Sequence, residues 1–200
     1  MISARQFLGM LKEECTKLGV TTLFPETEKV KYSDDGMLYT SGYFDGDAKI
    51  IACAVGKPEE QWFEILVHES CHMDQWAEEA TIWDDYNEYV DTSEWIAGEY
   101  IPKAALRKSF ETSVALELDC EKRAVKKMMD LELDIDVERY IQKANSYLLF
   151  YTVVSKTRRW YDVAPYDVPE LVDRMSTLLL DDYTAISDEL LDLYKKLCYK

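Results

Sequence analysis

The sequence has only two histidines among its 200 residues, and its positive charges are few and scattered. Lys and Arg total 23 against 39 Asp and Glu, so the formal net charge is −16. No basic run is longer than the Arg158–Arg159 pair. Proteins that bind nucleic acid through its phosphates need a basic face. The composition therefore argues against nucleic acid as a partner and, for the same reason, against anionic membrane surfaces.

Long apolar runs and paired cysteines are also missing. No apolar stretch approaches the ~20 residues of a membrane span, and the N-terminal segment lacks the basic-then-apolar order of a signal peptide. We therefore expect a cytoplasmic protein that does not enter a membrane. The five cysteines form an odd set without paired spacing. In a reducing compartment they are expected to remain free thiols.

The periodicity predicts one α+β domain over residues 1–200, with a small N-terminal antiparallel sheet packed on a mostly helical remainder. Helical spacing runs from Ser3, a capping residue, to Gly19, a terminating one. Between residues 28 and 55, alternation and two turn signals predict a three-stranded meander that ends in Lys49–Val55.

Later segments read as helices, except for the acidic and aromatic region 79–103, which is expected to be a loop with short helical turns. Gly56 and Pro58 mark the start of a helix that reaches about Ala80. The other helices are expected at 104–131, 137–154, 168–180 and 183–197.

Both histidines lie in one string, His68-Glu69-Ser70-Cys71-His72, on a predicted helix. Residues i and i+4 share a helix face, so the two imidazoles can hold one metal ion. Glu69 lies close enough to touch a metal-bound water without being a ligand, and is the candidate general base. We predict a zinc site at this HExxH motif.

A third protein ligand is needed, and no third histidine exists. The ligand must therefore be a carboxylate or a thiolate. The helix expected at 104–131 offers Glu117 and Glu121, which share a face, and Asp119 in an alternative register. Cys71 and Cys120 are the thiolate alternatives, although free cysteines are more often small core residues. We favour Glu117 as the ligand, with Glu121 accepting a hydrogen bond from a ligand imidazole.

HExxH followed about 45 residues later by Glu117-x-x-x-Glu121 resembles the gluzincin branch of the zincin metallopeptidases, whose second motif is ExxxD. The strand that runs into the motif helix and the string ELDCEKRA are similar to compact peptidases of the ImmA/IrrE type and to small phage-encoded relatives. The resemblance covers residues 47–125 and leaves 126–200 as a helical C-terminal extension. The Glu at position 121 departs from the Asp of the family pattern.

The resemblance implies a zincin-like fold with zinc at His68, His72 and Glu117, and Glu69 as general base. It also implies that a strand beside the motif helix holds a protein or peptide substrate as an added strand. We expect Tyr147 to stabilise the oxyanion, because the helix at 137–154 would follow the metal-site helix in space.

Residues 79–103 lie between the two motif helices in the sequence and are expected near the cleft. Their acidic side chains would favour basic substrates. The leading hypothesis is a zinc-dependent peptidase, and the alternative is a catalytically silent zincin-like binding or regulatory protein with a structural metal. The proposed groove aromatics are Trp83, Tyr86, Tyr89, Trp95 and Tyr100, and the acidic residues are Asp84, Asp85, Glu88, Asp91 and Glu94.

Overall fold

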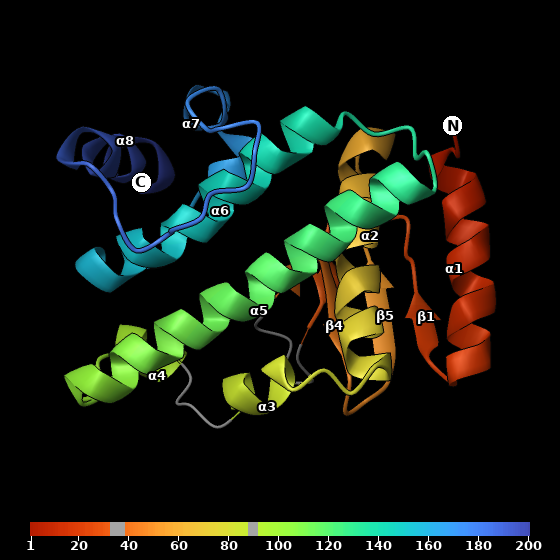
Figure 1. Cartoon of the computed structure of the whole chain (residues 1–200), viewed down its shortest axis with the longest axis horizontal. Coiled ribbons are helices and arrows are strands. Elements are labelled where there is room, and N and C mark those ends of the chain that lie inside the picture. The colour runs from red at the N-terminus through yellow and green to blue at the C-terminus, as the bar shows by residue number, and fades with distance from the viewer. Residues whose placement is uncertain (33–38, 88–91) are drawn as a thin grey trace. The chain divides into compact units, whose positions relative to one another are not determined.

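The computed structural model describes residues 1–32, 39–87 and 92–200 (Figure 1). These residues form two units, between which the chain passes more than once. The first unit comprises 1–80 and 123–135, and the second comprises 81–122 and 136–200. The prediction of a single domain over 1–200, with its core at 47–125 and its extension at 126–200, stays a prediction.

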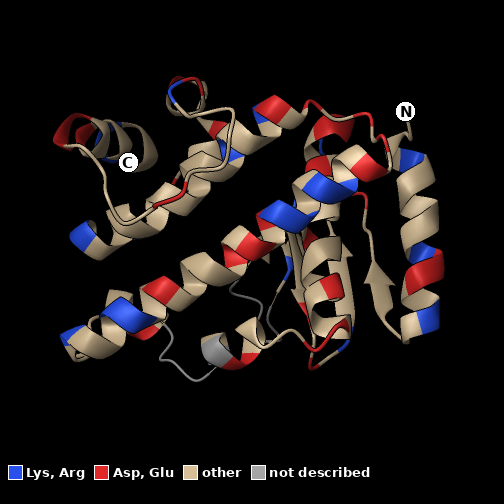
Figure 2. Cartoon of the chain, in the orientation of Figure 1, with Lys and Arg blue, Asp and Glu red and all other residues tan. Residues whose placement is uncertain are grey.

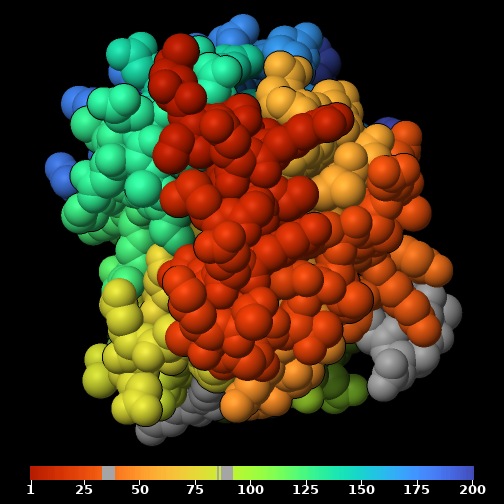
Figure 3. All heavy atoms as spheres, turned by 90° about the vertical axis from the view of Figure 1, so that its right-hand side faces the viewer, coloured from red at the N-terminus to blue at the C-terminus, as the bar shows by residue number. Residues whose placement is uncertain are grey.

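Helix α1 (Ala4–Leu18) opens the first unit and confirms the predicted N-terminal helix. Gln6 Oε1 accepts a hydrogen bond from the Ser3 backbone N–H at 2.9 Å, and Ser3 Oγ accepts one from the Gln6 N–H at 3.4 Å. This reciprocal pair satisfies two of the orphan donors at the helix start. The helix ends at Gly19, whose φ of 69° favours glycine. In Figure 3 the N-terminal residues, coloured red, lie at the surface that faces the viewer.

The first unit contains a three-stranded sheet with the strand order β1-β5-β4. Its central strand, β5 (Ile50–Cys53), is buried; β1 (Thr21–Leu23) pairs with it in parallel, and β4 (Gly42–Asp45) pairs antiparallel. The turn between β4 and β5 lies at the predicted Asp45–Asp47 signal. Strand β1 was not predicted, because three residues are too few to show an alternating pattern.

A separate two-stranded ladder joins β2 (Val30–Lys31) to β3 (Tyr39–Thr40). The predicted three-stranded antiparallel meander is therefore wrong in its connectivity, since the chain bends at Ser41 and β4 joins a mixed sheet. The first turn signal, at 33–36, and the start of the predicted strand at Met37 lie outside the described residues.

Helix α2 (Glu59–Ala77) packs on β4 and β5 and carries the HExxH string. It starts after Pro58, as predicted, and Glu59 and Glu60 in its first turn complement the positive helix end. It ends at Ala77 rather than Ala80. Helix α1 also packs on α2, where the ring centroids of Phe7 and Phe63 lie 5.7 Å apart.

Helix α5 (Lys103–Asp130) is continuous, and its last turns belong to the first unit. The second unit contains the rest of α5 together with α6 (Val137–Thr157). Both helices confirm the expected segments. The predicted short helical turns before α5 are α3 (Ile82–Asn87) and α4 (Thr92–Ala97). The core of this unit is built around Phe150 of α6, which is fully buried.

A buried asparagine on α6 fixes the chain that follows. The Asn145 side-chain amide donates to the carbonyls of Ser176 and Leu178, each at 2.9 Å. Its oxygen accepts from the Leu180 N–H at 3.3 Å and from the Tyr183 hydroxyl at 2.6 Å. Because these backbone groups bond Asn145, they do not continue a helix, and the segment wraps across α6.

Both predicted C-terminal helices are longer than the helices in the structure. The segment 168–180 holds only α7 (Pro169–Val172), after the short 3-10 helix η1 (Pro165–Asp167). The last helix, α8 (Asp188–Cys198), begins later than position 183. Ser187 sets this start, because its hydroxyl oxygen accepts a hydrogen bond from the Leu190 N–H at 3.2 Å.

All five cysteines are free, as predicted, and all are buried. Charges of both signs occur along α5 and α6 rather than on separate elements (Figure 2). Within the described part of the chain, no helix has the length and apolar character needed to cross a bilayer. The expected fold class is thus confirmed as mixed α+β with a small sheet and a mostly helical body, while the antiparallel sheet is corrected to a mixed one.

Candidate metal centre

Helix α2 brings the two histidines together on one face. The ring centroids of His68 and His72 lie 4.8 Å apart, with the ring planes at 85°. His72 is buried and His68 is half-buried. Two imidazoles one helical turn apart present the nitrogen spacing that a single metal ion needs.

The His72 ring is held by a residue that the sequence reasoning missed. Gln75 Oε1 lies 2.8 Å from His72 Nδ1, and the Gln75 side chain is fully buried. An amide oxygen can only accept, so Nδ1 carries the proton and Nε2 keeps the lone pair that a metal requires. The only sequence signal for Gln75 is its position, one turn after His72.

The candidate base Glu69 lies beside the sheet. A Cβ placed on Gly42 of β4 would lie only 3.2 Å from Glu69 Cγ, so this glycine permits the close approach of strand and helix. The pKa of Cys53 on β5 is raised to about 12, first by burial and then by the negative charge of Glu69. Glu69 is half-buried, next to an edge strand.

The last turns of α5 are anchored to α2 by charged side chains. Lys127 Nζ lies 2.6 Å from Asp74 Oδ2 and donates to Ser70 Oγ at 2.9 Å. Arg123 Nη1 lies 2.7 Å from Glu78 Oε2. Burial by itself would lower the pKa of Lys127, but the neighbouring negative charges, including Asp74, raise it above its usual value. These contacts set the register of α5 on the motif helix.

Cys120 lies one turn before Arg123 on the unbroken α5. Ligand atoms of His68, His72 and Cys120 all lie within 4.8 Å of one another, so this group could hold a metal ion. Two imidazoles and a thiolate are ligands that zinc accepts. Cys120 is fully buried. The third member of the group is thus one of the thiolate alternatives, whereas Glu117, the favoured ligand, lies one turn earlier on the same helix.

Within the second unit, Glu117 lies among tyrosines. The hydroxyls of Tyr147 and Tyr151 are 3.3 Å apart. The pKa of each is raised well above the usual value, first by burial, and the negative charge of Glu117 contributes to both. The role predicted for Tyr147, stabilisation of the oxyanion, stays a prediction.

The other carboxylates of the second motif have different surroundings. Glu121 is buried, and its charge contributes to raising the pKa of Tyr183 to about 12, behind burial of the phenol itself. Asp119 is half-buried. The roles predicted for Glu121 as a partner of a ligand imidazole and for Asp119 as an alternative ligand stay predictions.

The expected groove aromatics divide between two places. Trp83 and Tyr86 of α3 stack edge-on, with ring centroids 6.0 Å apart. Trp95 and Tyr100 line a cavity of the second unit that is described below. Tyr89, Glu88 and Asp91 lie outside the described residues.

Comparisons with known proteins identify no family for this chain. No family model, curated protein or solved structure matches the chain. The zincin resemblance therefore depends on the motif residues themselves. The chain holds a group of two histidines and one cysteine that could bind a metal ion.

Proposed function

We propose that the protein is a zinc-dependent peptidase of the gluzincin type. The observation that carries the proposal is the HExxH face of α2, where the ring centroids of His68 and His72 lie 4.8 Å apart and Gln75 Oε1 lies 2.8 Å from His72 Nδ1. The donor set suits zinc, because imidazole nitrogens with one thiolate or carboxylate are its usual protein ligands.

In this proposal the protein residues bind the substrate and move protons. Zinc, when bound, would acidify a water and polarise the scissile carbonyl. Glu69 accepts the proton of the attacking water and delivers it to the leaving amine. Tyr147 keeps its own proton at neutral pH, because burial raises its pKa, and donates a hydrogen bond to the developing oxyanion.

Strand β4 offers a place for the substrate backbone. It is an edge strand of the three-stranded sheet and lies beside Glu69, where Gly42 allows the close approach. An extended peptide can add to such an edge through backbone hydrogen bonds. The substrate we propose is therefore a protein or peptide in an extended conformation, and the net charge of −16 would favour a basic one.

The test of the mechanism is Glu69→Gln, with Glu60→Gln in the first turn of the same helix as the matched control. Glu69→Gln should retain zinc, measured by elemental analysis, and lose hydrolysis of a fluorogenic casein by about 100-fold or more. Glu60→Gln should change neither. Full activity in Glu69→Gln, or less than about 0.1 zinc per chain in the wild type, contradicts the proposal.

A second candidate is a catalytically silent binding protein with a structural metal. The observation that favours it is the presence of Cys120 beside both histidines. If Glu117 binds as well, the four protein ligands close the site and leave no position for water.

Two single variants separate these candidates. In a catalytic site with three protein ligands, only one of Cys120→Ser and Glu117→Gln should weaken zinc binding by about 100-fold or more. In a closed site both should. Cobalt substitution gives an independent readout, because a thiolate ligand adds a sulfur-to-metal absorption band that Cys120→Ser abolishes. Asp130→Asn, at an exposed position of the same helix, is the matched control.

A further inference from the structure

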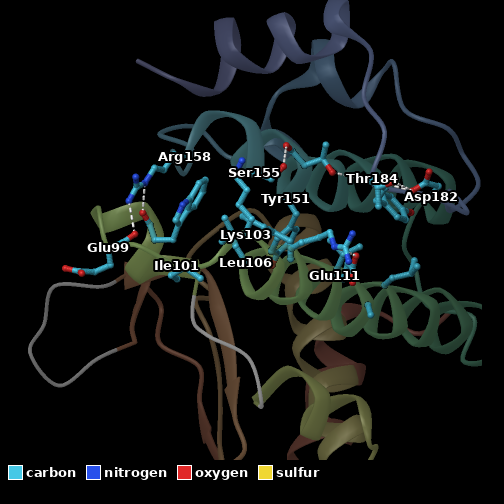
Figure 4. A pocket seen from close by; sticks show the side chains of 18 of the residues that line it. Glu99, Ile101, Lys103, Leu106, Glu111, Tyr151, Ser155, Arg158, Asp182 and Thr184 are labelled. Carbon is cyan, nitrogen blue, oxygen red and sulfur yellow. Dashed lines mark hydrogen bonds and ion pairs between the residues drawn. The ribbon is translucent and has the colours of Figure 1, made fainter.

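The second unit contains a cavity that the proposed chemistry does not use. It has a volume of about 1170 Å³ and runs between α5 and α6. Figure 4 shows Arg158 and Glu99 at one end, Asp182 and Thr184 at the other, and Lys103, Leu106 and Tyr151 between them. Ligand pockets commonly measure ~300–1,000 Å³, so this cavity can hold several side chains.

The floor of the cavity is an apolar stripe on α5. Leu106, Phe110, Val114 and Leu118 all line it and follow one another at four-residue spacing. Residues at that spacing share one helix face, and this stripe is about 18 Å long. Tyr151 of α6 also lines the cavity. An apolar groove of this length is the kind of surface that accepts alternate side chains of a bound peptide.

The two ends of the cavity differ in charge. Asp181 and Asp182 contribute carboxylates at one end, whereas Glu111, which also lines the cavity, pairs with Arg107 at 3.5 Å. At the other end the Arg158 guanidinium already donates hydrogen bonds within the protein, to the carbonyls of Trp95 at 2.6 Å and Glu99 at 3.0 Å. The excess of carboxylates at the Asp181 end favours a basic group on the ligand there.

Tyr151 joins this cavity to the tyrosines beside Glu117. Its side chain lines the cavity, and its hydroxyl lies 3.3 Å from that of Tyr147. The Glu117 charge acts on both hydroxyls. A ligand in the cavity would therefore lie next to residues that the proposed function assigns to catalysis.

We propose that the cavity binds a substrate peptide with successive large apolar side chains and a basic residue at the Asp181 end. The apolar side chains lie against the α5 stripe, and the basic residue pairs with Asp181 and Asp182. This inference rests on the proposed function in calling the peptide a substrate, whereas the binding itself needs no hydrolysis.

The probe is a fluorescein-labelled peptide of about eight residues, with Leu at every second position and two terminal Lys, measured by fluorescence anisotropy. Ala115→Trp is the blocking variant, because Ala115 is exposed, lines the cavity and sits on α5. Ala104→Trp is its matched control, since Ala104 is exposed on the same helix outside the cavity. We expect Ala115→Trp to raise the Kd by about tenfold or more and Ala104→Trp to leave it unchanged.

The charge contribution is tested with Asp181→Lys against Asp134→Lys, which makes the same change in net charge in the first unit. Asp181→Lys should weaken binding of the Lys peptide and improve binding of a Glu counterpart, while Asp134→Lys should have little effect on either. The proposal is overturned if the wild type shows no saturable binding below about 1 mM. It is also overturned if a Leu-to-Ser peptide binds equally well, or if Ala115→Trp only dissociates a dimer of this chain.

The binding assay is run on Glu69→Gln and on chelator-treated protein as well as on the wild type. Binding that survives without zinc or hydrolysis, together with the expected effects of Ala115→Trp, supports the cavity even where the peptidase proposal fails. If the protein hydrolyses peptides but Ala115→Trp leaves the peptide affinity unchanged, the peptidase proposal is supported. The proposal that the cavity binds the substrate is then refuted. The two proposals therefore fail separately.

Discussion

Replacing Gln75 with leucine should weaken zinc binding while leaving every proposed ligand in place. Gln75 Oε1 accepts the Nδ1–H of His72 at 2.8 Å in a buried setting. Metal binding through Nε2 forces the proton onto Nδ1, so the metal-bound form depends on this acceptor. In the metal-free form of the variant, the His72 ring can move its proton from Nδ1 to Nε2, so that no buried N–H is left without the Gln75 acceptor. The free-energy cost of the substitution therefore falls on the metal-bound form.

The magnitude follows from the buried donor. A buried N–H that loses its acceptor costs ~1–3 kcal/mol, which matches the ~10–100-fold loss of affinity typical when such a partner of a ligand histidine is removed. The assay is a zinc titration of chelator-treated protein in competition with a chromophoric chelator. Circular dichroism checks that the variant is folded.

The control is Gln61→Leu, earlier on the same helix, which should leave the zinc Kd unchanged. Gln75→Glu is the informative second variant, because a carboxylate also accepts from Nδ1 and should keep or tighten binding. A zinc Kd for Gln75→Leu within about twofold of the wild type would refute the argument that this hydrogen bond prepares His72 for a metal.

Three further predictions concern stability and are read out by chemical denaturation. Asn145→Leu should lower the free energy of unfolding by ~3–5 kcal/mol, because it removes four hydrogen bonds at a fully buried site. Gly42→Ala should cost ~1–3 kcal/mol, since the added Cβ would lie 2.6 Å from a side chain of α2, whereas Gly9→Ala has no neighbour within 4 Å and should not destabilise. The raised pKa of Lys127 implies a stabilisation that is complete below about pH 10 and is lost as the pH rises through the folded-state pKa, a loss that Lys127→Met should remove.

Elements whose signals are local could be predicted from the sequence. The start and end of α1 follow from Ser3 and Gly19, and the long apolar periods of α5 and α6 identified both helices. Periodicity and capping act within a few residues, so they need no knowledge of the fold. The HExxH face of α2 belongs to the same class, because i and i+4 geometry is a property of one helix.

Elements that depend on tertiary partners could not be predicted in this way. Strand β1 exists because it pairs with β5, and its three residues carry no pattern of their own. The segment after α7 leaves the helical path because Asn145 bonds its backbone from another helix. In both cases a long-range partner decides the backbone conformation, which local propensity does not report.

The third metal ligand shows the same limit at the level of chemistry. Because the chain has no third histidine, the sequence indicated a third ligand on the helix that became α5. It could not decide which residue within one turn of that helix binds the metal. The register is set instead by contacts such as Lys127 with Asp74 and Arg123 with Glu78, which lie outside any ligand motif. With α5 held there, the group that could hold a metal contains Cys120. A change that alters these anchors should therefore alter zinc affinity without touching a ligand, and Arg123→Met is the direct way to measure that dependence.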